Sequence, residues 1–267
     1  MRLLVTRPEP QASQWATALR DAGLDAQALP LIAISAPTDA AAVTALWHSL
    51  PTRRALMFVS PAAVDWFFRL RPPGATWPAQ TLAAAPGPGT ARALRAQGAG
   101  HGLHPELLVS PADDLGQFDS EALWPLLAGL DWSGQQVVIV SGGDNDGAKG
   151  RTWLTQQWRQ QGAQVEVVQT YRRGPGHWQA PEAALARQAL AEPASHLWLF
   201  SSSQAIDFLI AHHLPSLDAQ AGDAARTLRA LCTHPRIAER AQAAGMRDVH
   251  LCAPTLDAVV QARRSVA

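Results

Sequence analysis

The sequence predicts an α/β protein built from two similar modules of parallel β-sheet. Short apolar runs that suit buried strands alternate with helical stretches, a pattern typical of parallel sheets covered on both faces. The segment at residues 58–67 also returns in similar form at residues 200–209. A copy of this length indicates a duplicated module. Two modules that face each other form a cleft, where a small ligand usually binds.

Length and composition limit the class of protein. The chain of 267 residues suits two domains, and its 47% of hydrophobic residues can build two cores. The 22 Lys and Arg residues balance the 22 Asp and Glu residues, so no nucleic-acid partner is expected. We find no signal-peptide pattern and no apolar run long enough to span a membrane. Cys232 and Cys252 are interpreted as buried free thiols, and we expect a cytoplasmic protein.

The chain opens with a strand followed by a helix. Residues 3–6 form a short buried strand, and apolar residues at helical spacing then lead to Gly23, which is suited to end a helix. The same unit recurs as a strand at residues 137–140 and a helix that ends near Gly162. An extended segment follows each unit, at residues 26–34 and 165–171.

Two longer regions follow these extended segments, and each alternates strands with helices. The predicted strands are residues 55–59, 81–85, 197–201 and 228–233, and the predicted helices are residues 62–70, 90–97, 205–211 and 237–244. If the opening unit completes the last region, domain 1 is discontinuous. The expected division is residues 1–34 plus 172–267 as domain 1 and residues 35–171 as domain 2. The connectors near residues 26–34 and 165–172 would then form a hinge.

The loops that follow the predicted strands form the candidate binding site, because ligands of open parallel sheets bind beyond the carboxyl ends of the strands. These loops are rich in hydroxyl groups and glycine, and they contain few acids or bases. The candidate substrate-binding residues are Thr6, Arg7, Ser60, Pro61, Gly87, Thr90, Ser201, Ser202 and His234.

Each candidate has a structural alternative. Ser60 and Pro61 suit the start of a helix, whose free N–H groups can bind a carboxylate or phosphate or can simply be capped. The same two interpretations, anion binding or simple helix capping, apply to the Ser201 to Ser203 run and to Thr90. Arg7 can grip a substrate carboxylate through two hydrogen bonds, or it can tie down its own loop. His234 is more often a structural residue in such a turn.

The glycine-rich stretch at residues 142–150 does not match known phosphate or metal loops. It ends in Ala148-Lys149-Gly150, where a phosphate-binding loop requires Gly-Lys-Ser or Gly-Lys-Thr. Asp144 and Asp146 lack the closing Glu of a calcium loop. No Cys and His spacing fits zinc, and no Ser-His-Asp or Cys-His set is apparent. We therefore expect no metal, and a nucleotide-dependent enzyme ranks low.

An ordered set of short segments resembles the uroporphyrinogen-III synthase family over nearly the whole chain. The segments are Leu4-Val5-Thr6-Arg7-Pro8, Leu29-Pro30-Leu31-Ile32, Phe58-Val59-Ser60-Pro61-Ala62-Ala63-Val64, Pro86-Gly87-Pro88-Gly89-Thr90-Ala91, Asp119-Ser120-Glu121, Gly162-Ala163-Gln164-Val165 with Tyr171-Arg172-Arg173, and Phe200-Ser201-Ser202. Two positions depart from the family pattern. Ser141-Gly142 stands where many bacterial members have Arg-Gly, and Ile237 replaces an expected hydroxyl residue.

The resemblance implies two flavodoxin-like domains joined by a two-stranded connector. It also implies an enzyme that closes the linear tetrapyrrole hydroxymethylbilane into uroporphyrinogen III with loss of water and inversion of ring D, without a cofactor. Tyr171 stands where family members carry a tyrosine proposed to assist loss of the hydroxyl group, and it is the expected catalytic residue. Thr90 stands where the family has a substrate-facing threonine. We expect a monomer.

One alternative function stays open at this stage. The loops lack an obvious acid–base pair, which would also suit a non-catalytic protein that binds a small polycarboxylate in its cleft. The resemblance favours the synthase, because holding a substrate that ionises readily is mainly a matter of positioning.

Overall fold

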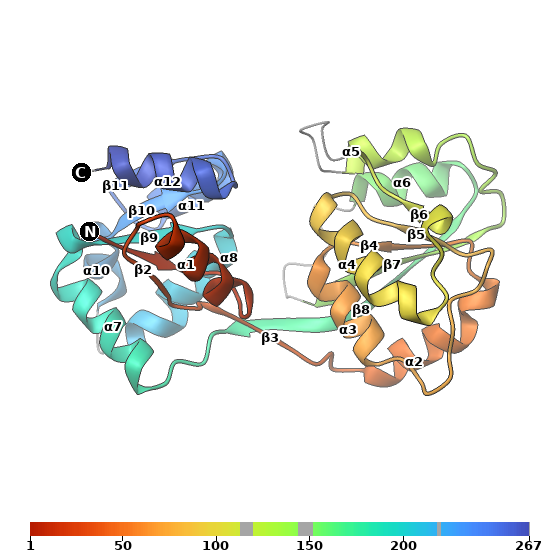
Figure 1. Cartoon of the computed structure of the whole chain (residues 1–267), viewed down its shortest axis with the longest axis horizontal. Coiled ribbons are helices and arrows are strands. Elements are labelled where there is room, and N and C mark those ends of the chain that lie inside the picture. Colours follow the sequence, from red (N-terminus) through yellow and green to blue (C-terminus); the bar gives the residue numbers. More distant parts are fainter. Residues whose placement is uncertain (113–119, 144–151, 218–219, 267) are drawn as a thin grey trace. The chain divides into compact units, whose positions relative to one another are not determined.

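Two β-sheets, each dominated by parallel strands, organise the computed structural model into two compact units, and Figure 1 labels most of their elements. The structure describes residues 1–112, 120–143, 152–217 and 220–266. Unit 1 consists of Met1–Ile34 and Gly174–Ala267, and unit 2 is Ser35–Arg173. The predicted fold class is confirmed, since parallel strands alternating with helices dominate both sheets. Asp119 and residues 144–150, which the sequence analysis singled out, lie outside the described residues.

The sheet of unit 1 has the flavodoxin-like strand order. Its strands are β1 (Arg2–Val5), β2 (Ala26–Ala28), β9 (His196–Phe200), β10 (Arg229–Cys232) and β11 (Asp248–Leu251). They follow the order β2-β1-β9-β10-β11, and each neighbouring pair is parallel. β2 lies on one side of β1, and the later strands β9, β10 and β11 lie on the other. The topological switch point, where doubly wound sheets bind their ligands in a crevice, is therefore between β1 and β9.

Helices cover both faces of this sheet because its strands are apolar on both sides. Leu3 and Val5 pack with α1 and α12, whereas Leu4 faces the opposite way and packs with α7, α8 and α11. Side chains alternate between the two faces of a strand, so a continuous apolar run suits a sheet buried on both sides. The helices are α1 (Gln11–Asp21), α7 (Ala180–Ala191), α8 (Ser203–Phe208), α9 (Leu214–Ser216), α10 (Ala221–Thr227), α11 (Pro235–Ala243) and α12 (Leu256–Ser265), with a π-helical turn at Leu209–His213 and a 3-10 turn at Pro193–Ser195.

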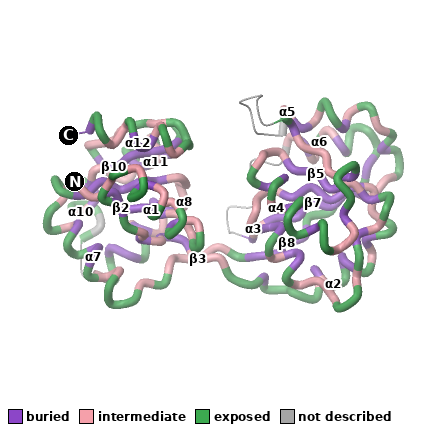
Figure 2. The backbone as a smooth tube through the Cα atoms, viewed as in Figure 1, coloured by how far each residue is buried: buried purple, intermediate pink, exposed green. Residues whose placement is uncertain are grey.

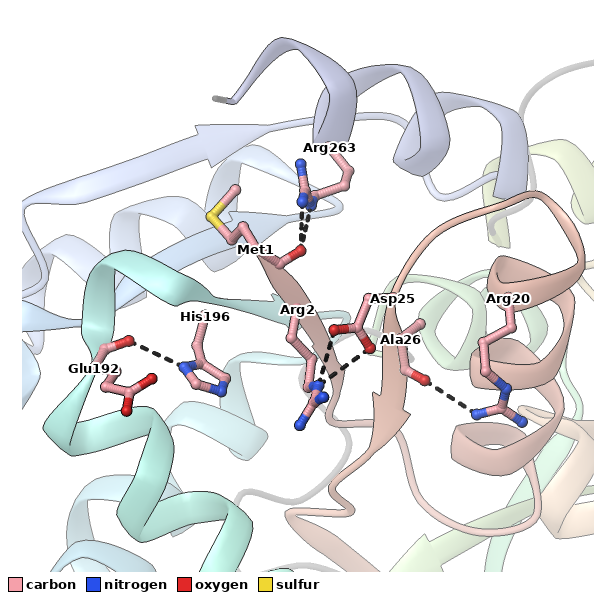
Figure 3. A network of polar contacts seen from close by, with 8 residues as sticks. All are labelled: Met1, Arg2, Arg20, Asp25, Ala26, Glu192, His196 and Arg263. Carbon is pink, nitrogen blue, oxygen red and sulfur yellow. Dashed lines mark hydrogen bonds and ion pairs between the residues drawn. The ribbon is translucent and has the colours of Figure 1, made fainter.

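The amino-terminal edge of the unit 1 sheet is fixed by paired polar groups, as Figure 3 shows. The Nε atom of Arg2 lies 3.1 Å from both carboxylate oxygens of Asp25. Arg263 of α12 donates from Nε to the carbonyl oxygen of Met1 at 2.9 Å. Nδ1 of His196 lies 3.0 Å from the carbonyl oxygen of Glu192. These polar groups at the start of β1 and β9 therefore have protein partners.

The sheet of unit 2 repeats the same order from a different starting point in the chain. Its strands are β3 (Ile32–Ser35), β4 (Ala55–Phe58), β5 (Leu82–Ala84), β6 (Leu108–Val109), β7 (Gln136–Gly143) and β8 (Gln164–Pro175). The order is β3-β8-β7-β4-β5-β6. Counted from β7, the order β8-β7-β4-β5-β6 matches that of unit 1, and the switch point lies between β7 and β4. The duplication seen in the sequence is thus a duplicated topology.

Aromatic side chains pack against one face of the unit 2 sheet. Trp47 of α2 stacks on Phe67 of α3 with ring centroids 4.3 Å apart, and Phe58 of β4 meets Phe67 edge-on at 5.3 Å. Trp132 and Trp158 pack on the other face. The helices are α2 (Ala40–Ser49), α3 (Pro61–Arg69), α4 (Pro88–Gly98), α5 (Ser120–Leu123) and α6 (Thr152–Gln160), with 3-10 turns at Leu50–Thr52, Ala99–His101, Pro105–Leu107 and Trp124–Leu126. In both units the strands are largely buried and the outer helix faces are exposed (Figure 2).

Two expected elements are corrected by the structure. The extended segment at residues 26–34 is two strands, β2 and β3, which belong to different sheets. Pro30 lies between them, and proline cannot donate a ladder hydrogen bond. The helix predicted from Thr90 begins earlier, at Pro88, because proline's fixed φ suits the first helical position. Thr90 is consequently not the cap of this helix.

No helix in the described part of the chain is long and apolar enough to cross a membrane.

Candidate functional site

A bulge in β8 shapes the switch point of unit 2. Ser141 of β7 pairs with Gln169, but the next residue, Gly142, pairs with Tyr171, so Thr170 is the extra residue. Thr170 is buried, and its hydroxyl oxygen lies 3.3 Å from the carbonyl oxygen of Ser141. Bulges change the direction of the residues that follow them. This one positions Tyr171 beside the carboxyl end of β7.

The phenol of Tyr171 is held by two polar side chains. Its Oη atom lies 3.1 Å from Oγ of Ser60, and Nη2 of Arg173 donates to the same Oη atom at 3.1 Å. Because Arg173 can only donate, the phenol oxygen acts as an acceptor there and keeps its own proton available for Ser60. Tyr171 itself is only 1% exposed, whereas Ser60 is half-buried. Ser60 is therefore the more accessible of the two hydroxyl groups.

Ser60 also caps helix α3, as predicted. Its backbone is extended, and its Oγ atom accepts a hydrogen bond from the backbone N–H of Ala63 at 3.2 Å. Pro61 occupies the first helical position. The local sequence thus places Ser60 Oγ at the carboxyl end of β4. There the same oxygen caps α3 and contacts the phenol of Tyr171.

Gly142 makes room for the tyrosine ring. A Cβ atom built on Gly142 would lie 2.4 Å from Cζ of Tyr171, well inside van der Waals contact. Only glycine lets the β7 backbone approach the ring so closely. The glycine of the Ser141-Gly142 pair, where the resemblance also expects glycine, is in this way matched to Tyr171.

At the switch point of unit 1, Thr6 and Arg7 follow β1. Val5 pairs with Leu199, and the backbone N–H of Thr6 donates to the carbonyl oxygen of Leu199 at 3.4 Å, so Arg7 follows β1 at the same edge of the sheet where Ser201 follows β9. Thr6 is 1% exposed, and its hydroxyl group donates to the carbonyl oxygen of Leu199 at 2.7 Å. This bond uses the hydroxyl proton of Thr6 to hold the two strand ends together.

Arg7 carries a partly buried charge that has no acidic partner among the described residues. Its Cζ atom lies 4.1 Å from the centroid of the Trp15 ring, and its Nε atom is buried without a hydrogen bond to any described residue. Burial lowers the pKa of Arg7, because a guanidinium loses hydration there. The acid nearest in sequence, Glu9, instead accepts a hydrogen bond from the hydroxyl group of Ser13 at 2.9 Å.

Two further polar atoms at this switch point are buried without partners. They are Oγ of Ser201, just after β9, and Oε1 of Gln204 in α8, and neither has a hydrogen bond to the described residues. Buried polar groups are nearly always hydrogen-bonded, and each exception calls for an explanation. Such atoms are free to bind a ligand.

The other predicted residues lie at helix starts. Ser202 precedes α8 but makes no side-chain capping bond, and Gly87 precedes α4. His234 caps α11 by accepting the N–H of Arg236 at 3.1 Å through Nδ1, so the structural alternative describes it well. Thr90 is the third residue of α4 and is 5% exposed.

Three residues of these sites were not anticipated from the sequence. The role of Thr170 could not be predicted, because the position of a β-bulge does not change the pattern of apolar residues in a detectable way. Arg173 was named only within the Tyr171-Arg172-Arg173 segment and given no role, although it lies two residues after Tyr171 and strand side chains two apart share a face. Gln204 was treated only as part of the repeat. Among the described residues, no group of three or more His, Cys, Asp or Glu could hold a metal ion.

Comparisons with known proteins agree with this architecture. A family model described as uroporphyrinogen-III synthase HemD matches residues 13–261. A solved mutant uroporphyrinogen III synthase from the extremely thermophilic bacterium Thermus thermophilus is 16% identical, with a TM-score of 0.56 over 100% of this chain and 98% of that chain. A uroporphyrinogen-III synthetase from Helicobacter pylori is 15% identical, with a TM-score of 0.55 over 100% of both chains. At these identities the structural likeness supports the fold alone.

Proposed function

Because the chain belongs to the uroporphyrinogen-III synthase family, we propose that it closes hydroxymethylbilane into uroporphyrinogen III, with loss of water and inversion of ring D. In enzyme classification this is a lyase reaction. The single observation in the molecule that carries the chemistry is the Ser60–Tyr171–Arg173 hydrogen-bond chain. These hydroxyl groups lie at the carboxyl end of a switch point, where doubly wound sheets bind their ligands, which supports a role for them as the proton donor.

The first chemical step is the departure of the terminal hydroxyl group. The pyrrole that carries the hydroxymethyl group supplies an electron pair, the C–O bond breaks toward oxygen, and the oxygen takes up a proton to leave as water. That proton comes from the Ser60–Tyr171 hydroxyl pair, with Ser60 as the group that faces the substrate and Tyr171 as the group that reprotonates Ser60. The Arg173 guanidinium stabilises the negative charge that develops on the phenol oxygen.

The remaining steps need little acid–base chemistry from the protein. The resulting azafulvenium cation is attacked by the substituted position of ring D, which gives a spiro intermediate that fragments and closes again in the inverted sense. When the final ring regains aromaticity it releases a proton, which restores Tyr171. Protons therefore balance over the reaction, and water is the only by-product. The protein's main contribution is to hold the folded substrate in place.

Substrate binding is proposed for the loops beyond the strands, at Thr6, Arg7, Ser60, Pro61, Gly87, Thr90, Ser201, Ser202 and His234. These residues differ in whether their polar atoms already have hydrogen-bond partners in the protein. The hydroxyl proton of Thr6 and the Nδ1 atom of His234 already have protein partners, so these two residues support their loops. Arg7 and Ser201 have polar atoms without partners in the described residues.

We also propose that the enzyme is a cytoplasmic monomer that uses no cofactor. Cys232 and Cys252 are both free thiols, which is expected of a protein in a reducing compartment. Size-exclusion chromatography with light scattering tests the monomer, with a mass of 28.5 kDa as the expected result.

A coupled assay tests the proposed reaction. Hydroxymethylbilane is supplied to the purified protein, the products are oxidised, and the uroporphyrin isomers are separated by chromatography. We expect isomer III to dominate, whereas buffer and heat-inactivated protein give isomer I by spontaneous closure. Isomer I alone in the presence of folded protein would overturn the proposal.

A further inference from the structure

The switch point of unit 1 contains a cluster of polar atoms that the protein itself does not satisfy. Nε of Arg7, Oγ of Ser201 and Oε1 of Gln204 are all buried, and none has a hydrogen bond to the described residues. The opposite, amino-terminal edge of the same sheet behaves differently, since Arg2 and Arg263 are both hydrogen-bonded there (Figure 3). Three buried polar atoms at this ligand-binding edge are thus left for a ligand to satisfy.

The duplicated topology shows that the fold does not require these polar residues. The repeat aligns Phe200 with Phe58, so Ser201 corresponds to Val59 and Gln204 corresponds to Ala62 in unit 2. Strand pairing gives a third equivalence: Val5 pairs with Leu199, whereas Ile139 pairs with Met57, and continuing both registers aligns Arg7 with Ser141. At all three positions, unit 2 has a smaller or less polar residue.

Arg7 has no anionic partner among the described residues, and an anionic ligand can supply one. A desolvated cation without an opposite charge is unfavourable, and proteins normally pair it. The two acids that local sequence brings nearest are engaged elsewhere: Glu9 binds Ser13, and Asp207 of α8 forms an ion pair with Arg240 at 2.6 Å. Arg7 as a whole is half-buried, so part of its side chain remains open to solvent.

The chemistry of the cluster favours a carboxylate. A planar guanidinium, here stacked on Trp15, presents two parallel N–H groups that match the two oxygens of a carboxylate. Ser201 adds a hydroxyl donor at the same edge of the sheet, and Gln204 Oε1 is an acceptor that suits an N–H group of the same ligand. A pyrrole that bears a carboxylate side chain offers both kinds of group.

We propose that Arg7 and Ser201 form a subsite for one carboxylate arm of the substrate, and that Gln204 accepts a hydrogen bond from a neighbouring pyrrole N–H. This inference rests on the proposed function for the identity of the ligand. It makes Arg7 a binding and specificity residue, separate from the Ser60–Tyr171–Arg173 chain of unit 2.

Binding of uroporphyrin III, which carries eight carboxylates, tests the subsite directly through quenching of tryptophan fluorescence. We expect Arg7→Gln to raise the Kd about 10- to 100-fold, since a hydrogen bond to a charged group is lost. Arg7→Lys keeps the charge but loses the planar fork, so it should lie between the wild type and Arg7→Gln. Ser201→Ala should raise the Kd by a smaller factor. Arg187→Gln, on the exposed side of α7, is the matched control and should bind like the wild type.

Thermal unfolding separates a binding role from a structural one. Because Arg7 is an unpaired, desolvated cation, Arg7→Gln should unfold at the same temperature as the wild type or higher. A lowered unfolding temperature for Arg7→Gln, or an unchanged Kd in the folded variant, would overturn the subsite.

The isomer assay keeps the two proposals apart. If the wild type forms isomer III and Arg7→Gln binds uroporphyrin III normally, the subsite is wrong and the proposed function stands. If the wild type forms only isomer I while Arg7→Gln loses binding, the carboxylate site stands and the proposed function is wrong.

Discussion

The switch point of unit 2 is satisfied by its own residues, whereas that of unit 1 is not. In unit 2, the hydroxyl groups of Ser60 and Tyr171 bind each other, and Arg173 donates to the phenol. In unit 1, Arg7 and Ser201 keep buried polar atoms without described partners. The two sheets have the same strand order, so topology does not explain the difference.

One duplicated fold can therefore serve two kinds of task. A site that must deliver a proton gains from groups that are already oriented, because no reorganisation is then needed during the reaction. A site that must hold an anion gains from donors left unpaired, because the ligand then supplies their partners. The second arrangement lowers the stability of the unliganded protein, which is a common consequence of building a binding site.

The largest expected effect is on turnover, from removing the phenol oxygen of unit 2. Tyr171→Phe keeps the ring against Gly142 but removes the proton donor, so we expect kcat to fall about 100-fold or more. The measurement is initial-rate formation of isomer III, with uroporphyrin III binding as a control that should stay unchanged. Wild-type turnover by Tyr171→Phe would show that the oriented hydroxyl pair is not the acid.

The next effect is on the stability of unit 2, through the close approach of Gly142 to the ring. Gly142→Ala places a methyl group 2.4 Å from Tyr171 Cζ, so we expect a loss of about 1–3 kcal/mol in the free energy of unfolding. Gly100→Ala is the matched control, because nothing lies within 4 Å of its added methyl group. Equal urea midpoints for the two variants would contradict the packing described here.

A pair of serine substitutions tests the comparison of the two units directly. Ser60→Ala removes a helix cap and a partner of Tyr171, so it should lower the free energy of unfolding by about 1–2 kcal/mol. Ser201→Ala removes a buried hydroxyl without a described partner, so stability should be unchanged or slightly higher. Urea denaturation measures the free energy of unfolding of both variants. An equal loss of that free energy in the two variants would mean that the Ser201 hydroxyl has a hydrogen-bond partner in solution.

The smallest effect concerns pH and is confined to unit 1. His213 stacks on Trp178 at 4.1 Å, and its Nε2 atom lies 3.2 Å from the carbonyl oxygen of Leu31. Burial lowers the pKa of His213, which the nearby His212 and His177 lower further against the opposing effect of the Leu31 carbonyl. Below pH about 6.5, the ordinary value for histidine, the unfolded chain binds the proton more readily, so stability falls as the pH decreases.

The variant His213→Gln checks this assignment, since glutamine can still donate to the Leu31 carbonyl but does not titrate. Urea midpoints of the wild type and the variant, measured between pH 7.5 and 5.5, should show a weaker pH dependence for the variant. Parallel curves would exclude His213 as the source.

The elements and the local helix caps can be predicted from the sequence. Apolar runs such as Leu3-Leu4-Val5 predict strands buried on both faces, because alternate side chains must both meet a core. Ser60 and Pro61 predict the start of α3 because capping is a local interaction between residues three apart. Gly23 ends the first helix through its positive φ of 83°, which is again a local property.

Tertiary structure alone decided which polar groups have partners. Tyr171 and Ser60 are 111 residues apart, and they meet because β4 and β8 flank β7 and a bulge at Thr170 redirects the chain. The repeated segments look alike in sequence, yet Ser60 bonds its helix whereas Ser202 does not. Whether a side chain is satisfied or left free for a ligand depends on what neighbouring strands bring beside it, and strand order follows from long-range packing.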